Sequence, residues 1–344
     1  MTVTETMPAG DARLHVAAFT GGAAVASARL RVRQYVAPLA DLGIVLRESW
    51  PALSAFPPHS RALRPAWLVG TLMQRLPSLA ASWSADIVLL QREMVSTLAT
   101  LEGWTRRPRL VDIDDAVHVH RGGRAARRLA GLADLVVVGN AWLAEVWRQW
   151  TRSVEILPTA VDTVRYRPAP PPLRPSIGWI GSAVNLRYLQ AIAPALQRVV
   201  RDFPDTEIAV CCDRPPDLPG LPLRWVPWSE QAEVAFLASI SIGVMPLADG
   251  PWERGKCSYK MLQYMAAGQP CVVSPVGMND QLLSEAELGL AATTLDEWSD
   301  ALASLLADRD GAQALGAAGR TLAEERYSVA ALAPRLAELL RFLA

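Results

Sequence analysis

Short apolar runs alternate along the first half of the chain with longer segments in which apolar residues recur at helical spacing. Uninterrupted runs of this kind are typical of strands buried on both faces of a sheet. They fall at residues 14–19, 86–90, 110–113, 135–138 and 154–157. The segment 26–42 has the apolar spacing of a helix. Strands that alternate with helices predict a parallel, doubly wound sheet.

A proline-rich segment at residues 167–175 interrupts this alternation, and the rhythm then starts again. So much proline is incompatible with a helix or a central strand, so the segment is predicted to link two domains. The expected strands of the second half are 176–180, 207–212, 223–226, 240–245 and 270–274. Its expected helices are 186–203, 230–238 and 259–267, and then a mostly helical tail from 298 to 344 that breaks at 308–311 and at Pro334.

Length and composition agree with two folded domains. The 344 residues exceed the ~150 of a typical domain, and 51% hydrophobic content excludes wholesale disorder. No uninterrupted run of ~18 apolar residues predicts a membrane span, and the first residues lack the pattern of a signal peptide. A cytoplasmic location is expected. The cysteines have no CxxC spacing, which favours free thiols over a zinc site; they are Cys211, Cys212, Cys257 and Cys271.

The neutral total charge hides an asymmetry between the halves. Residues 1–165 hold 19 Arg against 14 acidic residues, and residues 166–344 hold 15 basic against 20 acidic residues. The basic first half predicts an anionic partner, but the excess is too small for a duplex DNA binder. Its basic residues are either a solvated face or a contact to an anionic acceptor or to the inner face of a membrane. The candidates are Arg29, Arg31, Arg124, Arg127 and Arg128.

Only two of the 34 basic residues are lysines, and they lie four positions apart as Lys256 and Lys260. Because every other basic residue is an arginine, this pair indicates a place that needs a compact ammonium group. Both lysines and Arg254 flank the predicted start of a helix, after a strand. Cations beside helix N–H groups are suited to bind a diphosphate.

The same segment carries a family resemblance. Residues 255–274, GKCSYKMLQYMAAGQPCVVS, resemble the signature K-L-x-E-Y-M-A-x-G-x-P-V-V-x-S of GT-B glycosyltransferases of the family 4 type. Residues 156–162 (ILPTAVD), 177–181 (IGWIG) and 133–140 (ADLVVVGN) resemble further segments of that family in the same order. The resemblance covers roughly residues 110–344.

This resemblance implies an α/β protein of the GT-B fold, with two Rossmann-like domains and a cleft between them. Residues 1–166 would bind the acceptor and residues 176–328 the nucleotide-sugar donor, while a helix at 329–344 would return to the first domain. The implied reaction transfers a sugar to an acceptor hydroxyl with retention, without a metal or other cofactor. The acceptor would be a glycan, a lipid-linked molecule or another small molecule, and no nucleic acid is expected.

The resemblance also assigns residues to the donor. Diphosphate contacts are expected from Gly21, Gly22, Gly181, Ser182, Arg187, Arg254, Lys256 and Lys260. Ribose and base contacts are expected from Asp213, Pro227, Trp228 and Gln263. Three positions depart from the family pattern: Gly255 replaces its first Glu, with Glu253 the nearest acid, Gln263 replaces its second Glu, and Ser182 replaces an Arg.

Three carboxylates end the strand at 110–113, in the order Asp112, Asp114 and Asp115. Asp114, Asp115 and His118 are the catalytic candidates, because the family often has a His at this strand end. A carboxylate here could hold a sugar hydroxyl or cap the following helix. His118 and His120 could equally be ordinary surface residues.

Two other functions remain open at this stage. Asp112 and Asp114 resemble the nucleophile and acid of a haloacid dehalogenase-type phosphatase, although Ala116 departs from that motif. The other open function is that of a non-catalytic sugar-binding protein with a GT-B fold, because Gly255 stands where the family signature has its first Glu. Release of nucleotide from a sugar donor separates these hypotheses from the first.

Overall fold

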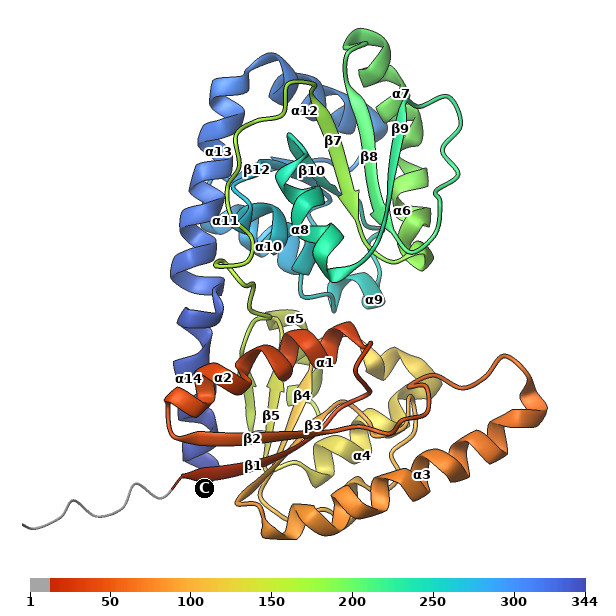
Figure 1. Ribbon diagram of the computed structural model, residues 1–344, viewed down its shortest axis with the longest axis vertical. Helices are drawn as coiled ribbons and strands as arrows, with labels where there is room; N and C mark the ends of the chain where they lie inside the picture. The colour runs from red at the N-terminus through yellow and green to blue at the C-terminus, as the bar shows by residue number, and fades with distance from the viewer. Residues whose placement is uncertain (1–12) are drawn as a thin grey trace, which may run out of the picture.

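A computed structural model, which describes residues 13–344, has two α/β domains stacked along the long axis of the molecule (Figure 1). Each domain is built on a six-stranded sheet in which every neighbouring pair of strands is parallel. The predicted fold class, two doubly wound domains, is confirmed.

The N-terminal sheet has the order β2-β1-β3-β4-β5-β6. Its strands are β1 Leu14–Phe19, β2 Ile44–Ser49, β3 Ile87–Gln91, β4 Arg109–Ile113, β5 Leu135–Val138 and β6 Val154–Ile156. The helices of this domain are α1 Ala26–Arg31, α2 Val36–Asp41, α3 Arg64–Ala81, α4 Arg124–Leu132 and α5 Ala141–Arg148.

The C-terminal sheet has the order β12-β11-β10-β7-β8-β9. Its strands are β7 Ser176–Ile180, β8 Glu207–Cys212, β9 Leu223–Pro227, β10 Ile242–Met245, β11 Cys271–Val273 and β12 Gly289–Ala291. Its helices are α6 Leu186–Ala191, α7 Ala193–Asp202, α8 Glu230–Ala238, α9 Pro251–Arg254, α10 Tyr259–Ala266, α11 Met278–Glu285, α12 Leu295–Ala307 and α13 Arg309–Leu322.

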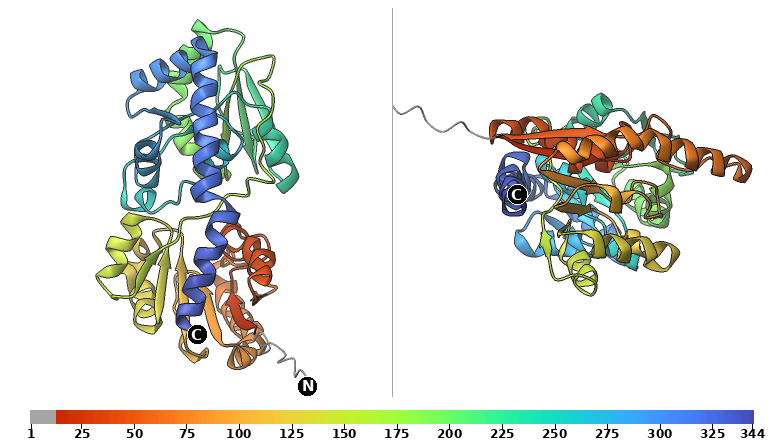
Figure 2. Two further views of the ribbon diagram at one scale, coloured as in Figure 1. Left: turned by 90° about the vertical axis from the view of Figure 1, so that its left-hand side faces the viewer. Right: turned by 90° about the horizontal axis from the view of Figure 1, so that it is seen from below.

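The last helix, α14 Val329–Leu343, crosses back from the C-terminal domain and runs along the N-terminal one (Figure 2). Its buried face includes Leu332, Leu336 and Leu340, which pack in one core with Tyr35 and Leu39 of the first domain. The chain therefore passes between the domains twice, once before β7 and once before α14.

Two helix predictions are wrong in detail. The segment 26–42 is not one helix, because the backbone of Val32 (φ −128°, ψ −61°) ends α1 and a short 3-10 turn precedes α2. Pro334 lies inside α14 and does not break it, and the interruption comes earlier, at a π-turn over Ala323–Tyr327. A proline removes one N–H donor, and the buried apolar face of α14 outweighs that loss.

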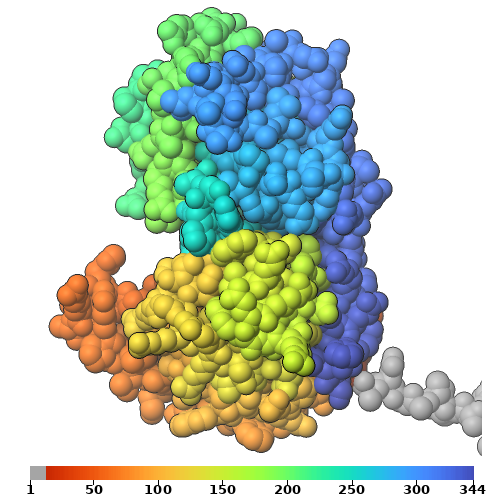
Figure 3. All heavy atoms as spheres, turned by 180° about the vertical axis from the view of Figure 1, so that it is seen from behind, coloured from red at the N-terminus to blue at the C-terminus, as the bar shows by residue number. Residues whose placement is uncertain are grey.

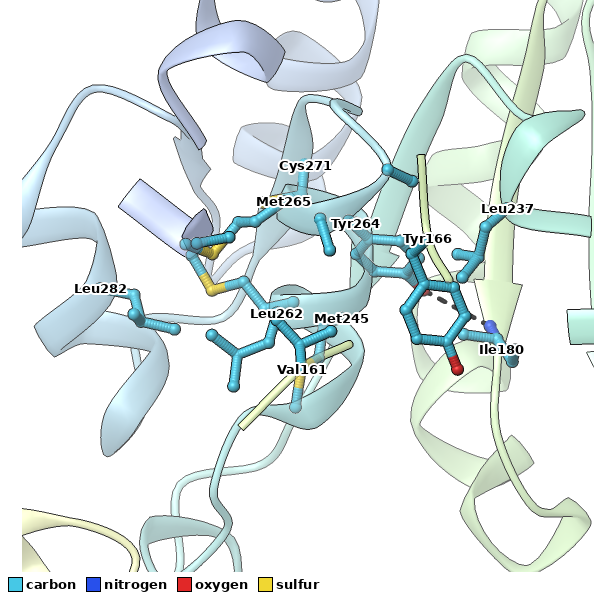
Figure 4. Close-up of a cluster of buried hydrophobic side chains, with 14 of the residues drawn as sticks. Val161, Tyr166, Ile180, Leu237, Met245, Leu262, Tyr264, Met265, Cys271 and Leu282 are labelled. Atoms are coloured by element: carbon cyan, nitrogen blue, oxygen red, sulfur yellow. Dashed lines mark hydrogen bonds between the residues drawn. The ribbon is translucent and has the colours of Figure 1, made fainter. Parts of the chain in front are cut away.

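The core of the C-terminal domain fixes α10 against the sheet (Figure 4). The Tyr264 ring lies against Gly243, where an added Cβ would come within 2.3 Å of it. The Tyr264 hydroxyl donates to the carbonyl of Val244 (3.1 Å) and accepts from the N–H of Ile180 (3.4 Å). These contacts anchor α10 to β7 and β10, so the first turn of α10 lies at the carboxyl end of the sheet.

All four cysteines are buried free thiols. Within residues 13–344, no helix is both long enough and apolar enough to cross a membrane.

Candidate active site between the domains

The two domains touch where the carboxyl ends of their strands face each other. Asn140, which caps α5 after β5, donates its side-chain amide to the carbonyls of Arg254 (3.2 Å) and Lys256 (3.0 Å). The Cys257 thiol donates to the carbonyl of Asp114 (3.0 Å), just after β4. The segment between α9 and α10 is therefore held directly over the ends of β4 and β5.

Two glycines make this close approach possible. A Cβ on Gly139 would lie 2.0 Å from Cys257 Sγ, and a Cβ on Gly255 would lie 2.6 Å from the Cβ of Ala116. The second contact explains the departure from the family signature, because no side chain fits at position 255 while the domains are in this arrangement.

Lys260 lies in the first turn of α10, with its stem over the end of β7. A Cβ on Gly181 would come within 2.7 Å of Lys260 Cε, so the glycine leaves room for the lysine. Lys260 Nζ is 5.7 Å from the centroid of the Trp179 ring, and Lys256 Nζ is 5.3 Å from that of Trp252. Burial, and then the charge of Lys256, lower the pKa of Lys260 to about 8.

An arginine that the sequence analysis did not single out holds the carboxylates opposite the lysines. Arg92 follows β3 with a left-handed backbone (φ 63°) and forms ion pairs with Asp114 (2.6 Å) and Asp115 (2.7 Å). Burial raises the pKa of Asp115, while Arg92 and Lys256 oppose this shift. Asp115 and Lys260 also attract each other, so a cluster of positively and negatively charged side chains extends from one domain to the other.

A cavity of about 150 Å³ opens beside this cluster on the N-terminal side. Its wall includes Gly21, Arg92, Glu93 and His120 from the first domain and Trp252 from the second. The His120 and Trp252 rings lie 5.0 Å apart across the domain boundary. Burial raises the pKa of the Glu93 carboxyl, an environment typical of functional sites.

The expectation for His118 has to be corrected. Its ring packs on Trp142 of α5 (5.4 Å) and on Trp150, which follows that helix (6.1 Å), and burial lowers its pKa. His118 is therefore part of an aromatic cluster inside the first domain, and His120, two residues later, lies at the cavity.

The prediction that Arg31 lies on the acceptor side is also wrong. Its guanidinium is buried and forms an ion pair with Asp112 (2.5 Å), and it donates to the carbonyl of Leu157 (2.8 Å). Because all these contacts are internal, Arg31 cannot face an acceptor. Asp112 is equally enclosed, so it is not positioned to act as a phosphatase nucleophile.

Arg29 and Gln263 lie in one buried network that joins the domains. Arg29 donates to Glu233 of α8 (2.8 Å), Tyr166 donates to the same oxygen (2.7 Å), and Gln263 donates to Tyr166 (3.1 Å). Burial alone would raise the pKa of Glu233, but its hydrogen bonds to Arg29 and Tyr166 hold that pKa below its usual range. Trp228 donates to the second Glu233 oxygen (3.2 Å).

The remaining donor-side candidates lie around the same strand ends. Arg254 pairs with Asp249 (2.6 Å) in solvent, and Arg187 donates to the hydroxyl of Tyr188 (2.7 Å). Asp213 accepts from the N–H of Ala183 (2.6 Å) and so supports the loop after β7. Of the three further candidates, Ser182 begins the turn before α6, Pro227 ends β9, and Gly22 follows the cavity residue Gly21.

The last three basic candidates lie on α4 and are exposed; they are Arg124, Arg127 and Arg128. The Arg127 guanidinium lies 5.8 Å from the centroid of the Trp150 ring.

Known structures resemble the whole described chain. The sucrose-phosphate synthase of Thermosynechococcus elongatus superposes with a TM-score of 0.71 at 16% identity, covering 96% of this chain and 99% of that one. The Anabaena protein HepE, solved with UDP and glucose, gives 0.72 at 12% identity over 96% and 100%. WaaG, a glycosyltransferase involved in lipopolysaccharide biosynthesis, gives 0.65 at 11% identity over 94% and 99%.

No curated protein sequence matches the chain significantly. Residues 174–308, from the start of β7 through α12, match the family described as glycosyl transferases group 1. The protein therefore has the GT-B fold, and the match to glycosyl transferases group 1 falls within its C-terminal domain.

Proposed function

We propose that this protein transfers a sugar from a nucleoside-diphosphate sugar to an acceptor hydroxyl. The observation that carries the proposal is the placement of Lys256 and Lys260 at the carboxyl end of the C-terminal sheet, opposite the Arg92-bound carboxylates. In open parallel sheets ligands bind at this edge. The group 1 family match and the UDP and UDP-glucose complexes of HepE support a nucleotide-sugar donor.

The two lysines would bind the donor diphosphate. When the bond between the sugar C1 and the phosphate oxygen breaks, its electron pair moves to the diphosphate, which gains negative charge. Ammonium groups already in place stabilise that charge more in the transition state than in the ground state. This supports a reaction without a metal ion.

The acceptor would enter through the cavity beside Arg92 and His120. Its hydroxyl oxygen forms the new bond to C1, and its proton leaves to the departing diphosphate oxygen. As the family resemblance implies, the acceptor would attack on the face that the diphosphate leaves, so the product would keep the anomeric configuration of the donor and the reaction would be retaining. Asp114, fixed by Arg92, would hold a hydroxyl of the transferred sugar.

A glycan, a lipid-linked molecule or another small molecule fits this proposal as acceptor. The exposed Arg124, Arg127 and Arg128 on α4 remain the proposed contact for anionic groups of that acceptor.

Two measurements test the proposal against its alternatives. The purified protein is incubated with UDP-glucose, GDP-mannose, ADP-glucose and TDP-glucose, and released nucleoside diphosphate is quantified with and without magnesium. A glycosyltransferase releases nucleotide from at least one donor. The second measurement offers a phosphate monoester, p-nitrophenyl phosphate: magnesium-dependent release of inorganic phosphate from it, without nucleotide release from any donor, would identify a phosphatase. Thermal stabilisation by a donor without either activity would identify a sugar-binding protein.

A further inference from the structure

The longest helix of the N-terminal domain presents large apolar side chains to solvent. Helix α3 buries Thr71, Leu79 and Arg75, whose guanidinium donates to the carbonyls of Thr20 (2.6 Å) and Met94 (3.2 Å). An ordinary amphipathic helix buries its apolar residues. In α3 two of the three buried residues are polar, and apolar residues remain in solvent on its outer face.

That outer face is a continuous stripe. Val69, Met73, Leu76 and Ala80 follow each other at spacings of four, three and four, so they lie on one side of α3. Val69 is 60% exposed, Met73 is 61% exposed, and Trp83 beyond the end of the helix is 62% exposed. Exposed apolar patches of this kind mark interaction sites.

The charge of this region is equally distinctive. Residues 49–85 contain no Asp or Glu, while Arg61 and Arg64 at the start of α3 are exposed. Two exposed tryptophans, Trp83 and Trp104, lie beyond the C-terminal end of the stripe, where the Trp83 indole donates a hydrogen bond to the Trp104 carbonyl. Tryptophan favours the membrane–water interface, and basic residues without acidic neighbours favour anionic lipid.

The shape also fits a lipid surface. The first part of the segment 50–83, here called the arm, stands off the rest of the N-terminal domain as an orange lobe in the space-filling view (Figure 3). A stable protein dimer needs ~800 Å² of complementary surface on each partner, whereas a convex ridge inserts readily into a soft interface. The inner side of the same arm contributes Phe56 and Trp67 to the wall of the candidate acceptor cavity.

We propose that the arm docks on an anionic lipid bilayer through the outer face of α3. The docked arm then places the cavity beside the membrane surface, where an acceptor carried on a lipid reaches it without leaving the bilayer. This surface is distinct from the basic residues of α4, and its lipid binding does not depend on the glycosyl-transfer proposal.

Vesicle flotation tests the proposal. Full-length protein is mixed with vesicles of phosphatidylcholine alone, or of equal parts phosphatidylcholine and phosphatidylglycerol. The wild type should bind the anionic vesicles more strongly than the neutral ones. The triple variant V69Q/M73Q/L76Q should lose about tenfold or more in binding, and each of R61S and R64S about fivefold.

A matched control replaces exposed apolar residues elsewhere, as V164Q/L173Q/F342Q, and should bind as the wild type does. Melting curves and light scattering accompany every variant to check folding and mass. The proposal is overturned if the wild type does not bind anionic vesicles, or if the arm variant and the control bind equally. It is also overturned if the wild type is a dimer that the arm variant converts to a monomer, because the stripe would then be a contact between two copies.

Discussion

Cys257 Sγ occupies the space that a side chain on Gly139 would need, since a Cβ there would lie 2.0 Å from the sulfur. Gly139 belongs to the N-terminal domain and Cys257 to the segment that carries the two lysines into the cleft. The domains can therefore approach this closely at the candidate site only because position 139 has no side chain to collide with the Cys257 thiol.

Gly139→Ala should push the two domains apart at this contact, because the added methyl group collides with the buried Cys257 sulfur and neither side can move away on its own. We expect a loss of ~1–3 kcal/mol in unfolding free energy, the usual cost of overpacking, together with weaker nucleotide binding. Thermal melting and calorimetric titration measure the two effects.

Cys257→Ala in the same chain removes the sulfur and should restore both properties. Gly131→Ala is the matched control, because nothing lies within 4 Å of a Cβ at that position. If Gly139→Ala melts and binds like the wild type, the close contact does not set the arrangement of the domains.

The buried pair of Arg31 and Asp112 makes a separate prediction about stability. Asp112→Ala leaves the Arg31 guanidinium charged inside the protein without its main partner, and the expected cost is ~3–5 kcal/mol. Arg107→Ala removes an exposed ion pair to Asp134 in the same domain and should cost far less, because water already screens the Arg107 charge. If both variants lose the same unfolding free energy in denaturant titrations, the buried ion pair of Asp112 matters no more than the exposed one, and the prediction is wrong.

Lys260 should make stability depend on pH in a defined window. Its pKa is about 8 in the folded protein against an ordinary 10.5, so the unfolded chain binds more protons between these values. The unfolding free energy contributed by this group therefore rises as pH increases from 8 to 10.5, because the buried charge is relieved. Lys260→Met should be more stable than the wild type at pH 7 by ~1–3 kcal/mol after solvent screening.

This advantage should shrink as pH rises from 8 to 10.5. Parallel urea titrations of both proteins at pH 7 and pH 10 measure the difference. An unchanged difference would mean that Lys260 keeps its proton and is not buried in the way described.

Much of the fold could be predicted because its signals are local. The buried strands of both domains are apolar runs, and the second sheet begins where the proline-rich segment ends. The helix α3 did not show in the same way, because its buried residues are partly polar: Arg75 is buried with Leu79, while Val69 is exposed. A pattern that assumes an apolar core cannot detect such a helix.

The site could be predicted only in part, for a similar reason. Lys256 and Lys260 stood out through their rarity, which is a property of composition. Arg92 did not, because its partners Asp114 and Asp115 lie more than 20 residues away and only the sheet brings them together. Arg31 was expected at the surface, yet Asp112, 81 residues later, holds it in the interior.

The most direct test of the account is whether the two lysines bind a nucleoside diphosphate. The wild type, the double variant K256A/K260A and the control R198A, which removes an exposed ion pair on α7, are screened by thermal shift against UDP, GDP, ADP and TDP. At a hundredfold excess over the dissociation constant, the right nucleotide should stabilise the wild type and the control by ~2.7 kcal/mol. The double variant should stay folded and lose affinity by ~10²-fold or more, because each charged hydrogen bond is worth ~1.5–3 kcal/mol. Equal stabilisation of all three proteins, or no stabilisation of the wild type by any of the four nucleotides, would contradict the account.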